Sequence, residues 1–249
     1  PSGETNITGA GGTPAFTNTL STTFDGVDDF VTMGNVLNTS STGASSFSMS
    51  CWFKTNATTS TYYLMSKARN VSQLDGYQMF ITGNGEIRFF IGRYTGNAAS
   101  SPWLYIRTNS NAWNDNNWHN IILTYNGNQS TSGLKVYIDN SLQSLTTLFN
   151  NTPSINSTSS EFMIGARGIT SSVDGFFDGK IDEASFFNTE LSASDITTIY
   201  NSGVPNDITS LSPLSWWRMG DGSTYPTIND EIGSNNGTMT NMSSANFVT

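Results

Sequence analysis

The sequence lacks three features that would place it in particular protein classes. It has one cysteine, Cys51, so neither an intrachain disulfide nor a cluster of thiolate metal ligands can form. It has no run of about 18 apolar residues and no charged-then-apolar leader, so we expect no membrane insertion, and no secretion signal is visible in it. Its ten Lys and Arg residues are scattered through a chain of net charge −9, which argues against nucleic acid as a partner.

Short segments rich in β-branched and aromatic residues fill the chain from Ser21 onward. Each is bounded by Gly, Asn, Asp or Ser, which is typical of strands joined by polar turns. In one segment Leu134, Val136 and Ile138 alternate with polar residues, so one face of that strand is expected on a core. The sequence therefore predicts an all-β sandwich of two antiparallel sheets. The predicted strands are DFVTMG, SFSMSCWFKT, YYLMSKA, GYQMFIT, EIRFFIG, WLYIRT, WHNIILTYN, GLKVYIDN, EFMIGAR and DGKIDEASFFN.

Two segments depart from the strand pattern. Residues 1–20 are rich in Gly, Thr and Asn without any periodicity, which predicts an irregular N-terminal arm or linker before a domain over residues 21–249. Residues 191–203 predict one short helix, because Ser192 can cap its start, apolar residues recur at helical spacing, and Gly203 follows its end.

Six motifs follow one another in order between residues 21 and 203. They are FDGVDDFV, SFSMSCWFK, NWHNIILTYNG, LKVYIDN, FMIGAR and GKIDEASFFNTELSASDITTIYNSG. F-D-G-x-x-D is weak alone, but its combination with W-H-x-x-x-x-x-Y and I-D-E-x-x-x-F-N is specific. The combination resembles the laminin-G-like, concanavalin-A-like jelly rolls, a family that includes lectins and glucanases. The resemblance implies a two-sheet jelly-roll sandwich.

The C-terminal segment, residues 214–249, contains LSWWRMGDG and NNGTMTNM. It resembles the strands that usually open such domains, although here it follows the last expected strand. Three explanations are open: a circular permutation in which the tail completes the same sandwich, the start of a tandem copy, or exchange with a neighbouring chain. We favour the first, because residues 1–20 contain nothing similar that could supply those strands.

The turn in residues 23–34 contains three acids, and two interpretations of it are open. In the first, Asp25 and Asp28 accept backbone N–H bonds in an Asx-type turn while Gly26 takes a positive φ. In the second, the turn binds Ca²⁺, which prefers carboxylate and carbonyl oxygens. The resemblance supports the second, since many such jelly rolls carry one structural calcium with a ligand from the closing strand. It implies Asp182 as that metal ligand and Asp25 as the next candidate.

We do not expect this chain to be an enzyme. Glucanases of this fold resemble one another in an E-x-D-x-E strand whose alternate carboxylates face one cleft, and no such triplet occurs here. In IDE, residues 181–183, the adjacent acids are expected to point to opposite faces of the strand. His119 belongs to the W-H pair that opens a strand, and we expect a hydrogen-bonded structural histidine. No two of the six glutamates lie close enough along one strand to form the pair of acids that a glucanase needs; they are Glu4, Glu86, Glu161, Glu183, Glu190 and Glu231.

The segment over residues 92–118 is the candidate ligand-binding region, because aromatic residues lie there among polar turns. Aromatic rings can stack on sugar faces while Asn, Asp and Arg fix sugar hydroxyls. In WLYIRT the period-two pattern places Trp103, Tyr105 and Arg107 on one face, away from Leu104 and Ile106. The predicted ligand-binding residues are Tyr94, Trp103, Tyr105, Arg107 and Trp113.

The sequence leaves several functions open. The first is a non-catalytic structural or adhesion module, extracellular or on a virion surface, that recognises glycans such as cell-surface polysaccharide or packs against neighbouring subunits. Low charge, surfaces rich in Asn, Ser, Thr and Gly, and a tail similar to modules of marine bacteriophage surface proteins favour it. The alternatives are a secreted carbohydrate-binding lectin domain attached to an enzyme and a glycoside hydrolase of the same fold, although the E-x-D-x-E strand of the latter is missing.

Overall fold

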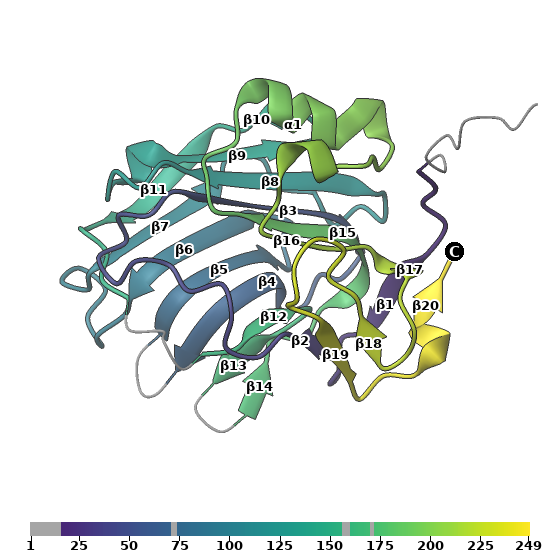
Figure 1. Ribbon diagram of the computed structural model, residues 1–249. Helices are drawn as coiled ribbons and strands as arrows, with labels where there is room; N and C mark the ends of the chain where they lie inside the picture. The colour runs from purple at the N-terminus through teal and green to yellow at the C-terminus, as the bar shows by residue number, and fades with distance from the viewer. Residues whose placement is uncertain (1–15, 71–73, 156–159, 170–171) are drawn as a thin grey trace, which may run out of the picture.

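Two large antiparallel sheets lie face to face in the computed structural model, which describes residues 16–70, 74–155, 160–169 and 172–249 (Figure 1). One sheet has eight strands and the other nine, and all strand pairs within them are antiparallel. The predicted all-β jelly-roll sandwich with one short helix is therefore confirmed. Of the predicted N-terminal arm, residues 1–15 lie outside the described residues, and residues 16–20 form no helix or strand.

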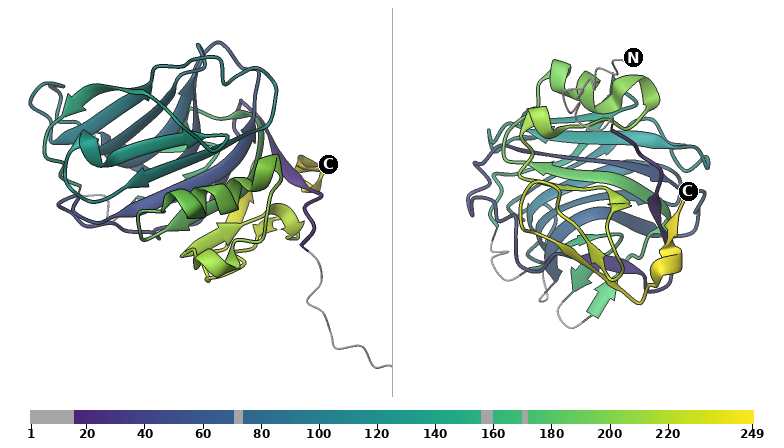
Figure 2. Two further views of the ribbon diagram at one scale, coloured as in Figure 1. Left: turned by 90° about the horizontal axis from the view of Figure 1, so that it is seen from above. Right: turned by 45° about the vertical axis from the view of Figure 1, so that its right-hand side comes forward.

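The eight-stranded sheet carries the helix on its outer face (Figures 1 and 2). Its strands, in spatial order, are β10 (Ser141–Leu142), β9 (Leu134–Ile138), β8 (His119–Tyr125), β3 (Phe47–Lys54), β15 (Asp178–Phe187), β1 (Ser21–Asp25) and β20 (Phe247–Val248), with β16 (Ser215–Trp217) also paired to β15.

The nine-stranded sheet forms the second layer, and a small two-stranded sheet extends from it. Its order is β11 (Leu145–Asn150), β7 (Trp103–Thr108), β6 (Ile87–Arg93), β5 (Leu74–Thr82), β4 (Thr61–Asn70), β12 (Phe162–Ile164), β2 (Phe30–Thr32), β19 (Gly237–Thr240) and β18 (Thr227–Ile228). The small sheet pairs β13 (Arg167–Ile169) with β14 (Ser172–Asp174). The remaining elements are β17 (Met219–Gly222), α1 (Ala193–Tyr200) and the 3₁₀ turns Thr131–Gly133, Asn201–Gly203, Thr209–Leu211 and Ser244–Asn246.

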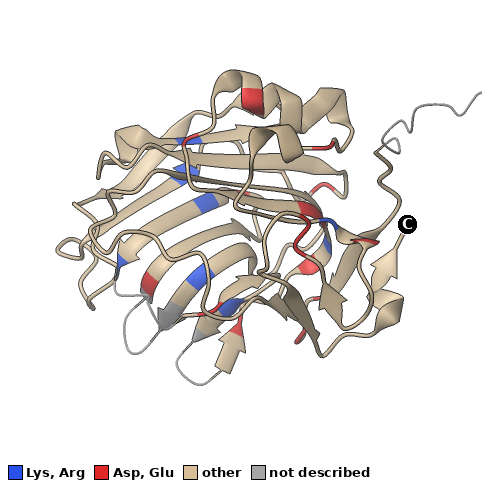
Figure 3. Ribbon diagram, in the orientation of Figure 1, with Lys and Arg blue, Asp and Glu red and all other residues tan. Residues whose placement is uncertain are grey.

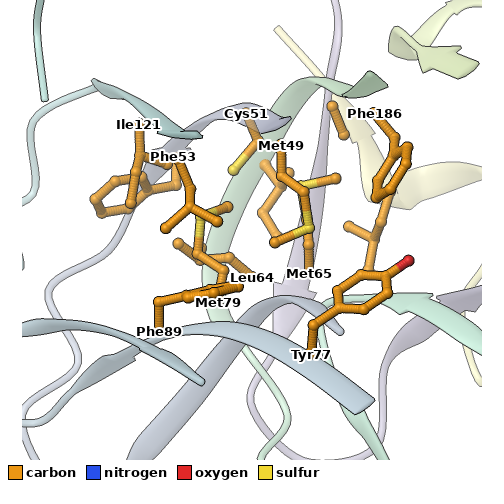
Figure 4. Packing of buried hydrophobic residues seen from close by; sticks show 14 of the residues in the cluster. Met49, Cys51, Phe53, Leu64, Met65, Tyr77, Met79, Phe89, Ile121 and Phe186 are labelled. Atoms are coloured by element: carbon orange, nitrogen blue, oxygen red, sulfur yellow. The ribbon is translucent and has the colours of Figure 1, made fainter. Parts of the chain in front are cut away.

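The core fills the space between the two sheets because strands of both layers alternate inward apolar residues with outward ones (Figure 4). Leu134, Val136 and Ile138 are all buried in it, as the alternation in their strand predicts. From the other layer Met79 and Phe89 point to the same space. Each fully buried side chain of this size contributes about 1.5–3 kcal/mol, so this interface is the main source of stability.

A second apolar cluster lies between α1 and the outer face of the eight-stranded sheet. Ile196 and Ile199 of the helix are buried there with Trp216 of β16. Ser192 caps the helix as predicted, and its side chain and that of Asp195 form a reciprocal capping box. Among the described residues, no helix has the length and apolarity needed to cross a membrane.

The tail strands pair with strands of the same chain. β16 lies beside β15, β19 beside β2 and β20 beside β1, so the tail contributes to both sheets (Figure 1). Trp217 of β16 is fully buried in the main core, where its ring stacks on that of Phe162 with centroids 5.5 Å apart. The tail therefore takes part in the core packing of this structure.

Candidate functional site

A groove of about 530 Å³ lies on the outer face of the nine-stranded sheet. We call it the outer groove; strands β4 to β7 and the β13–β14 hairpin line it. Leu104 and Ile106 of β7 enter the core, which leaves Trp103 and Tyr105 on the groove side of the same strand. The register places Tyr105 opposite Phe90 of β6, and Phe90 opposite Gln78 of β5. The groove floor is thus built from alternate residues of neighbouring strands.

Aromatic rings form one wall of the outer groove. The indole of Trp103 stacks on Phe149 with centroids 4.9 Å apart, and Tyr94 and Tyr105 contact it at 5.2 and 5.6 Å. Its Nε1–H donates to the carbonyl oxygen of Ala98 at 3.0 Å. Trp103 is only 6% exposed, whereas Tyr105 is half-buried. Trp103 therefore holds the neighbouring aromatic rings in place, and Tyr105 presents more ring surface to a ligand than Trp103 does.

A single carboxylate holds the two arginines beside this wall. Glu86 accepts from Nε and Nη2 of Arg88 at 3.1 and 2.8 Å, and it also accepts from Arg107. Arg88 Nη1 donates to the hydroxyl of Tyr105 at 3.0 Å. Burial alone would raise the pKa of Glu86, but the hydrogen bonds and charges of Arg88 and Arg107 outweigh it and lower that pKa. Glu86 therefore stays ionised and orients both guanidinium groups.

The opposite wall is a second ion pair. Arg167 donates from Nε and Nη2 to the two carboxylate oxygens of Asp174 at 2.9 and 2.7 Å. The guanidinium carbon lies 4.7 Å from the ring centroid of Tyr63. Between the two walls lies Gln78, which is 1% exposed and whose Nε2 has no hydrogen-bond partner in the described part of the chain. A buried amide donor without an acceptor is costly, and a bound oxygen would satisfy it.

The structure brings together four of the five predicted ligand-binding residues. Trp103 and Tyr105 line the outer groove, Tyr94 packs on Trp103, and Arg107 shares Glu86 with Arg88. Trp113 does not lie there: its ring packs edge-on against His119 at 5.1 Å and against the main core. It follows β7 in an irregular loop, where no strand period indicates a direction.

Sequence reasoning missed Gln78, Arg88 and the wall of Tyr63, Arg167 and Asp174. Arg88 had a usable signal, because the same period-two reading in EIRFFIG places it on the face opposite Ile87 and Phe89. The residues of the second wall come from segments far apart in the chain, and no local pattern joins them.

The two residues implied for calcium, Asp25 and Asp182, do not fit one ion. Asp25 of β1 pairs with Asp178 of β15, and Asp182 lies four residues further along β15, about 13 Å away at 3.3 Å per residue. Ligands of one Ca²⁺ lie at most about 5 Å apart. Asp25 and Asp182 therefore do not ligate the same ion.

The acidic turn matches the Asx-turn interpretation at Asp25. Asp25 Oδ1 accepts from the backbone N–H of Val27 and Asp28, and Gly26 has φ of +75°. Carboxylate oxygens of Asp25, Asp28 and Asp29 lie within 4.8 Å of one another. Asp29 already accepts from the N–H of Asp25 and the amide of Asn246. Hydrogen bonds within the chain therefore account for the turn.

The prediction that the acids of IDE point to opposite faces was wrong. Glu183 has φ of +46° at a bulge, where the β15 register shifts against β3 between Asp182 and Ser185. Both acids consequently lie on the outer side, buried to 4% and 6% exposure. Glu183 accepts from Trp216 Nε1 at 2.5 Å and from Arg218 Nε at 3.2 Å. Burial raises the pKa of both carboxyls, and the charge of Asp182 raises that of Glu183 further.

His119 is buried and hydrogen-bonded through both ring nitrogens, as expected for a structural histidine. Nδ1 lies 2.7 Å from Asp139 Oδ2, and Nε2 lies 3.1 Å from Asp115 Oδ1. Burial lowers the pKa of His119, but these hydrogen bonds and charges outweigh it and raise the pKa above its usual value. Its ring therefore ties the start of β8 to two neighbouring loops.

Residues 25–197 match the family model of the concanavalin A-like lectin/glucanases superfamily. The chain belongs to this superfamily. The resemblance inferred from its motifs is thus confirmed. No curated protein sequence matches the chain.

Solved structures of this superfamily's fold show the same architecture. A protein from Bacteroides ovatus, described as a candidate carbohydrate-binding protein, aligns with a TM-score of 0.64 at 14% identity. The alignment covers 92% of this chain, which spans 60% of that protein's length. The CBM40 of the Ruminococcus gnavus IT-sialidase, solved bound to α2,3-sialyllactose, aligns with a TM-score of 0.50 at 15% identity, over 76% of this chain and all of that one. At these identities the likeness establishes the fold.

Proposed function

We propose that this chain is a non-catalytic glycan-binding module and that the outer groove holds the glycan. The observation that carries the proposal is the pairing of a half-buried ring, Tyr105, with a guanidinium, Arg88, that is already oriented by Glu86. Three of the ten Lys and Arg residues of this sparsely charged chain (Figure 3) gather at the groove. Two solved proteins of the same fold support it, since one is described as a candidate carbohydrate-binding protein and the other was solved with a sialylated sugar.

The groove offers the two kinds of contact that a sugar needs. The C–H face of a pyranose ring packs against the ring of Tyr105, which is fixed by Phe149 and Trp103. Arg88 has five N–H groups, and its three hydrogen bonds to Glu86 and Tyr105 leave two of them for sugar hydroxyls. The buried Nε2 of Gln78 supplies a further donor at the floor. A neutral or anionic saccharide satisfies these donors with its oxygens.

The electrostatics of the groove support the non-catalytic part of the proposal. A glycosidase needs one carboxyl group kept protonated, with a raised pKa, beside a second carboxylate. Here the pKa of Glu86 is lowered by its two arginines, and Asp174 is held by both arms of Arg167. Neither carboxylate is arranged to donate a proton to a glycosidic oxygen.

The test is a glycan array followed by calorimetry with the best glycan, on wild type, Arg88→Gln, Tyr105→Ala and Tyr105→Phe. We expect Arg88→Gln to weaken binding about 10- to 100-fold, the loss of about 1.5–3 kcal/mol for a charged hydrogen bond. Tyr105→Ala is expected to weaken it similarly, whereas Tyr105→Phe keeps the ring and most of the affinity. Glu86 retains Arg107 in Arg88→Gln, so the fold is expected to persist.

Trp118→Ala is the matched control, because Trp118 lies at a pocket bordered by strands of the other sheet. A glycan whose affinity is unchanged in both Arg88→Gln and Tyr105→Ala would place binding elsewhere. Release of shorter sugars from the bound glycan by the wild-type protein would contradict the non-catalytic assignment.

A further inference from the structure

A second pocket, of about 240 Å³, lies on the outer face of the eight-stranded sheet, away from the outer groove. We call it the β15 pocket. Trp52 of β3 and Asp182 of β15 line it together with Asn18, which precedes β1, and Trp118, which precedes β8. The turn after α1 closes another side through Gly203. The pocket therefore combines a buried carboxylate with two indole rings.

The polar groups left unsatisfied in the β15 pocket are acceptors. Asp182 Oδ2 accepts from Asn18 Nδ2 at 2.7 Å, and Oδ1 accepts from the backbone N–H of Glu183 at 2.8 Å. Each carboxylate oxygen can accept one bond more. The carbonyl oxygen of the Asn18 side chain is buried and has no partner in the described part of the chain. Its orientation is fixed, because the amide nitrogen must face the carboxylate.

No Lys or Arg is among the described residues that line the pocket. The guanidinium of the nearby Arg218 is bonded to other groups than Asp182: it contacts Glu183 at 3.2 Å, Asp221 at 3.6 Å and the carbonyl oxygen of Thr17. Asp182 is only 4% exposed, so its carboxylate is taken out of water without a full counter-charge among the described residues that line the pocket. A cation entering the pocket would supply that charge.

The two indoles suit a cation as well. Trp52 is held by Tyr200, with parallel rings 5.9 Å apart, so its plane is fixed. Trp118 is 37% exposed, so part of its ring is available at the surface. Organic cations bind over indole faces more strongly than over other aromatic rings. A neutral sugar would gain less here, because it does not neutralise Asp182.

We propose that the β15 pocket binds a primary ammonium group, of the kind carried by amino sugars and lysine side chains. The three N–H donors of an ammonium match the two oxygens of Asp182 and the side-chain oxygen of Asn18. The alkyl part then lies against Trp52 and Trp118. This site is separate from the glycan groove, so each proposal stands or fails without the other.

The experiment follows tryptophan indole resonances by NMR during titration with butylammonium chloride, tetramethylammonium chloride and butanol at constant ionic strength. We expect butylammonium to shift the resonance of Trp118, with affinity at least tenfold above that of the other two probes. Asp182→Asn is nearly isosteric and should weaken binding at least tenfold, and Trp118→Ala about three- to tenfold. Tyr105→Ala, which alters the outer groove, should leave it unchanged.

Absence of a shift with butylammonium would overturn the proposal. Equal binding of tetramethylammonium, which has no N–H, or of butanol, which has no charge, would overturn it as well, as would full affinity in Asp182→Asn. Once butylammonium binds as expected, titration with glucosamine and with Nα-acetyl-lysine amide distinguishes the two sources of the ammonium group. Tighter binding of glucosamine indicates an amino sugar, and tighter binding of the lysine derivative indicates a lysine side chain.

Discussion

Replacing Trp217 with alanine tests whether the tail is part of this chain's own core. Trp217 lies in β16, is fully buried and stacks on Phe162 of β12. Its Nε1–H donates to the carbonyl oxygen of Asn235 at 2.8 Å. The indole thus joins the tail both to the nine-stranded sheet and to a later part of the tail itself.

The size of the effect follows from these contacts. Truncating a buried tryptophan to alanine costs about 3–5 kcal/mol of the free energy of unfolding, because transfer energy is lost and a cavity remains. For a domain of this length each kcal/mol lowers Tm by about 2–4 °C. We therefore expect Trp217→Ala to lower Tm by about 6–20 °C. Leu214→Ala is the matched control in the same tail: Leu214 is 43% exposed, and its backbone bond to Phe186 is kept, so we expect a change under about 1 kcal/mol.

The assay is urea unfolding followed by circular dichroism at low protein concentration, with gel filtration to establish the oligomeric state. A free-energy change for Trp217→Ala as small as that for Leu214→Ala would refute the reasoning. The tail would then not complete this sandwich, and a tandem copy or exchange between chains would have to be considered. A large effect that disappears on dilution would assign the tail to a neighbouring chain.

Two further predictions concern stability. The pKa of His119 is raised in the folded protein, so protonation of His119 stabilises the fold. This stabilisation is complete below the unfolded pKa of about 6.5 and is lost as pH rises through the folded pKa. The free-energy difference between wild type and His119→Gln should therefore be larger at pH 5.5 than at pH 8.5, and a difference independent of pH would contradict this. Asp25→Asn keeps the acceptor for Val27 and Asp28, so we expect it and wild type to melt within about 1 °C of each other in calcium and in chelator. A chelator-dependent loss of Tm in wild type alone would show that an ion holds the turn.

The alternation of apolar and polar residues was enough to predict the layers of this fold. A strand such as β9 has one face in the core, so Leu134, Val136 and Ile138 had to share it. The same rule predicted that Trp103 and Tyr105 lie together on the outer face of β7. One half of the outer groove could therefore be found from the sequence.

The rest of the site depends on contacts that cannot be predicted from the alternation of residues within one strand. Tyr63 and Arg167 meet across about a hundred positions of the chain, through the cation–π contact that forms the second wall. Trp113 lies in a loop, where packing against His119 and the core rather than a pleat sets the direction of its ring. Asp182 and Glu183 violate the alternation rule because a left-handed residue interrupts it, and such a residue is not evident from the letters IDE.

The bulge at Glu183 also determines where this domain tolerates changes in length. One extra residue in β15 keeps Ile181 before it and Phe186 after it on the same inner side. If the bulge were flattened into regular strand without losing a residue, the odd separation of Ile181 and Phe186 would turn them to opposite faces, whereas removing the extra residue leaves an even separation and keeps both inside. Natural variants of this chain that lack the bulge should therefore be one residue shorter between Ile181 and Phe186.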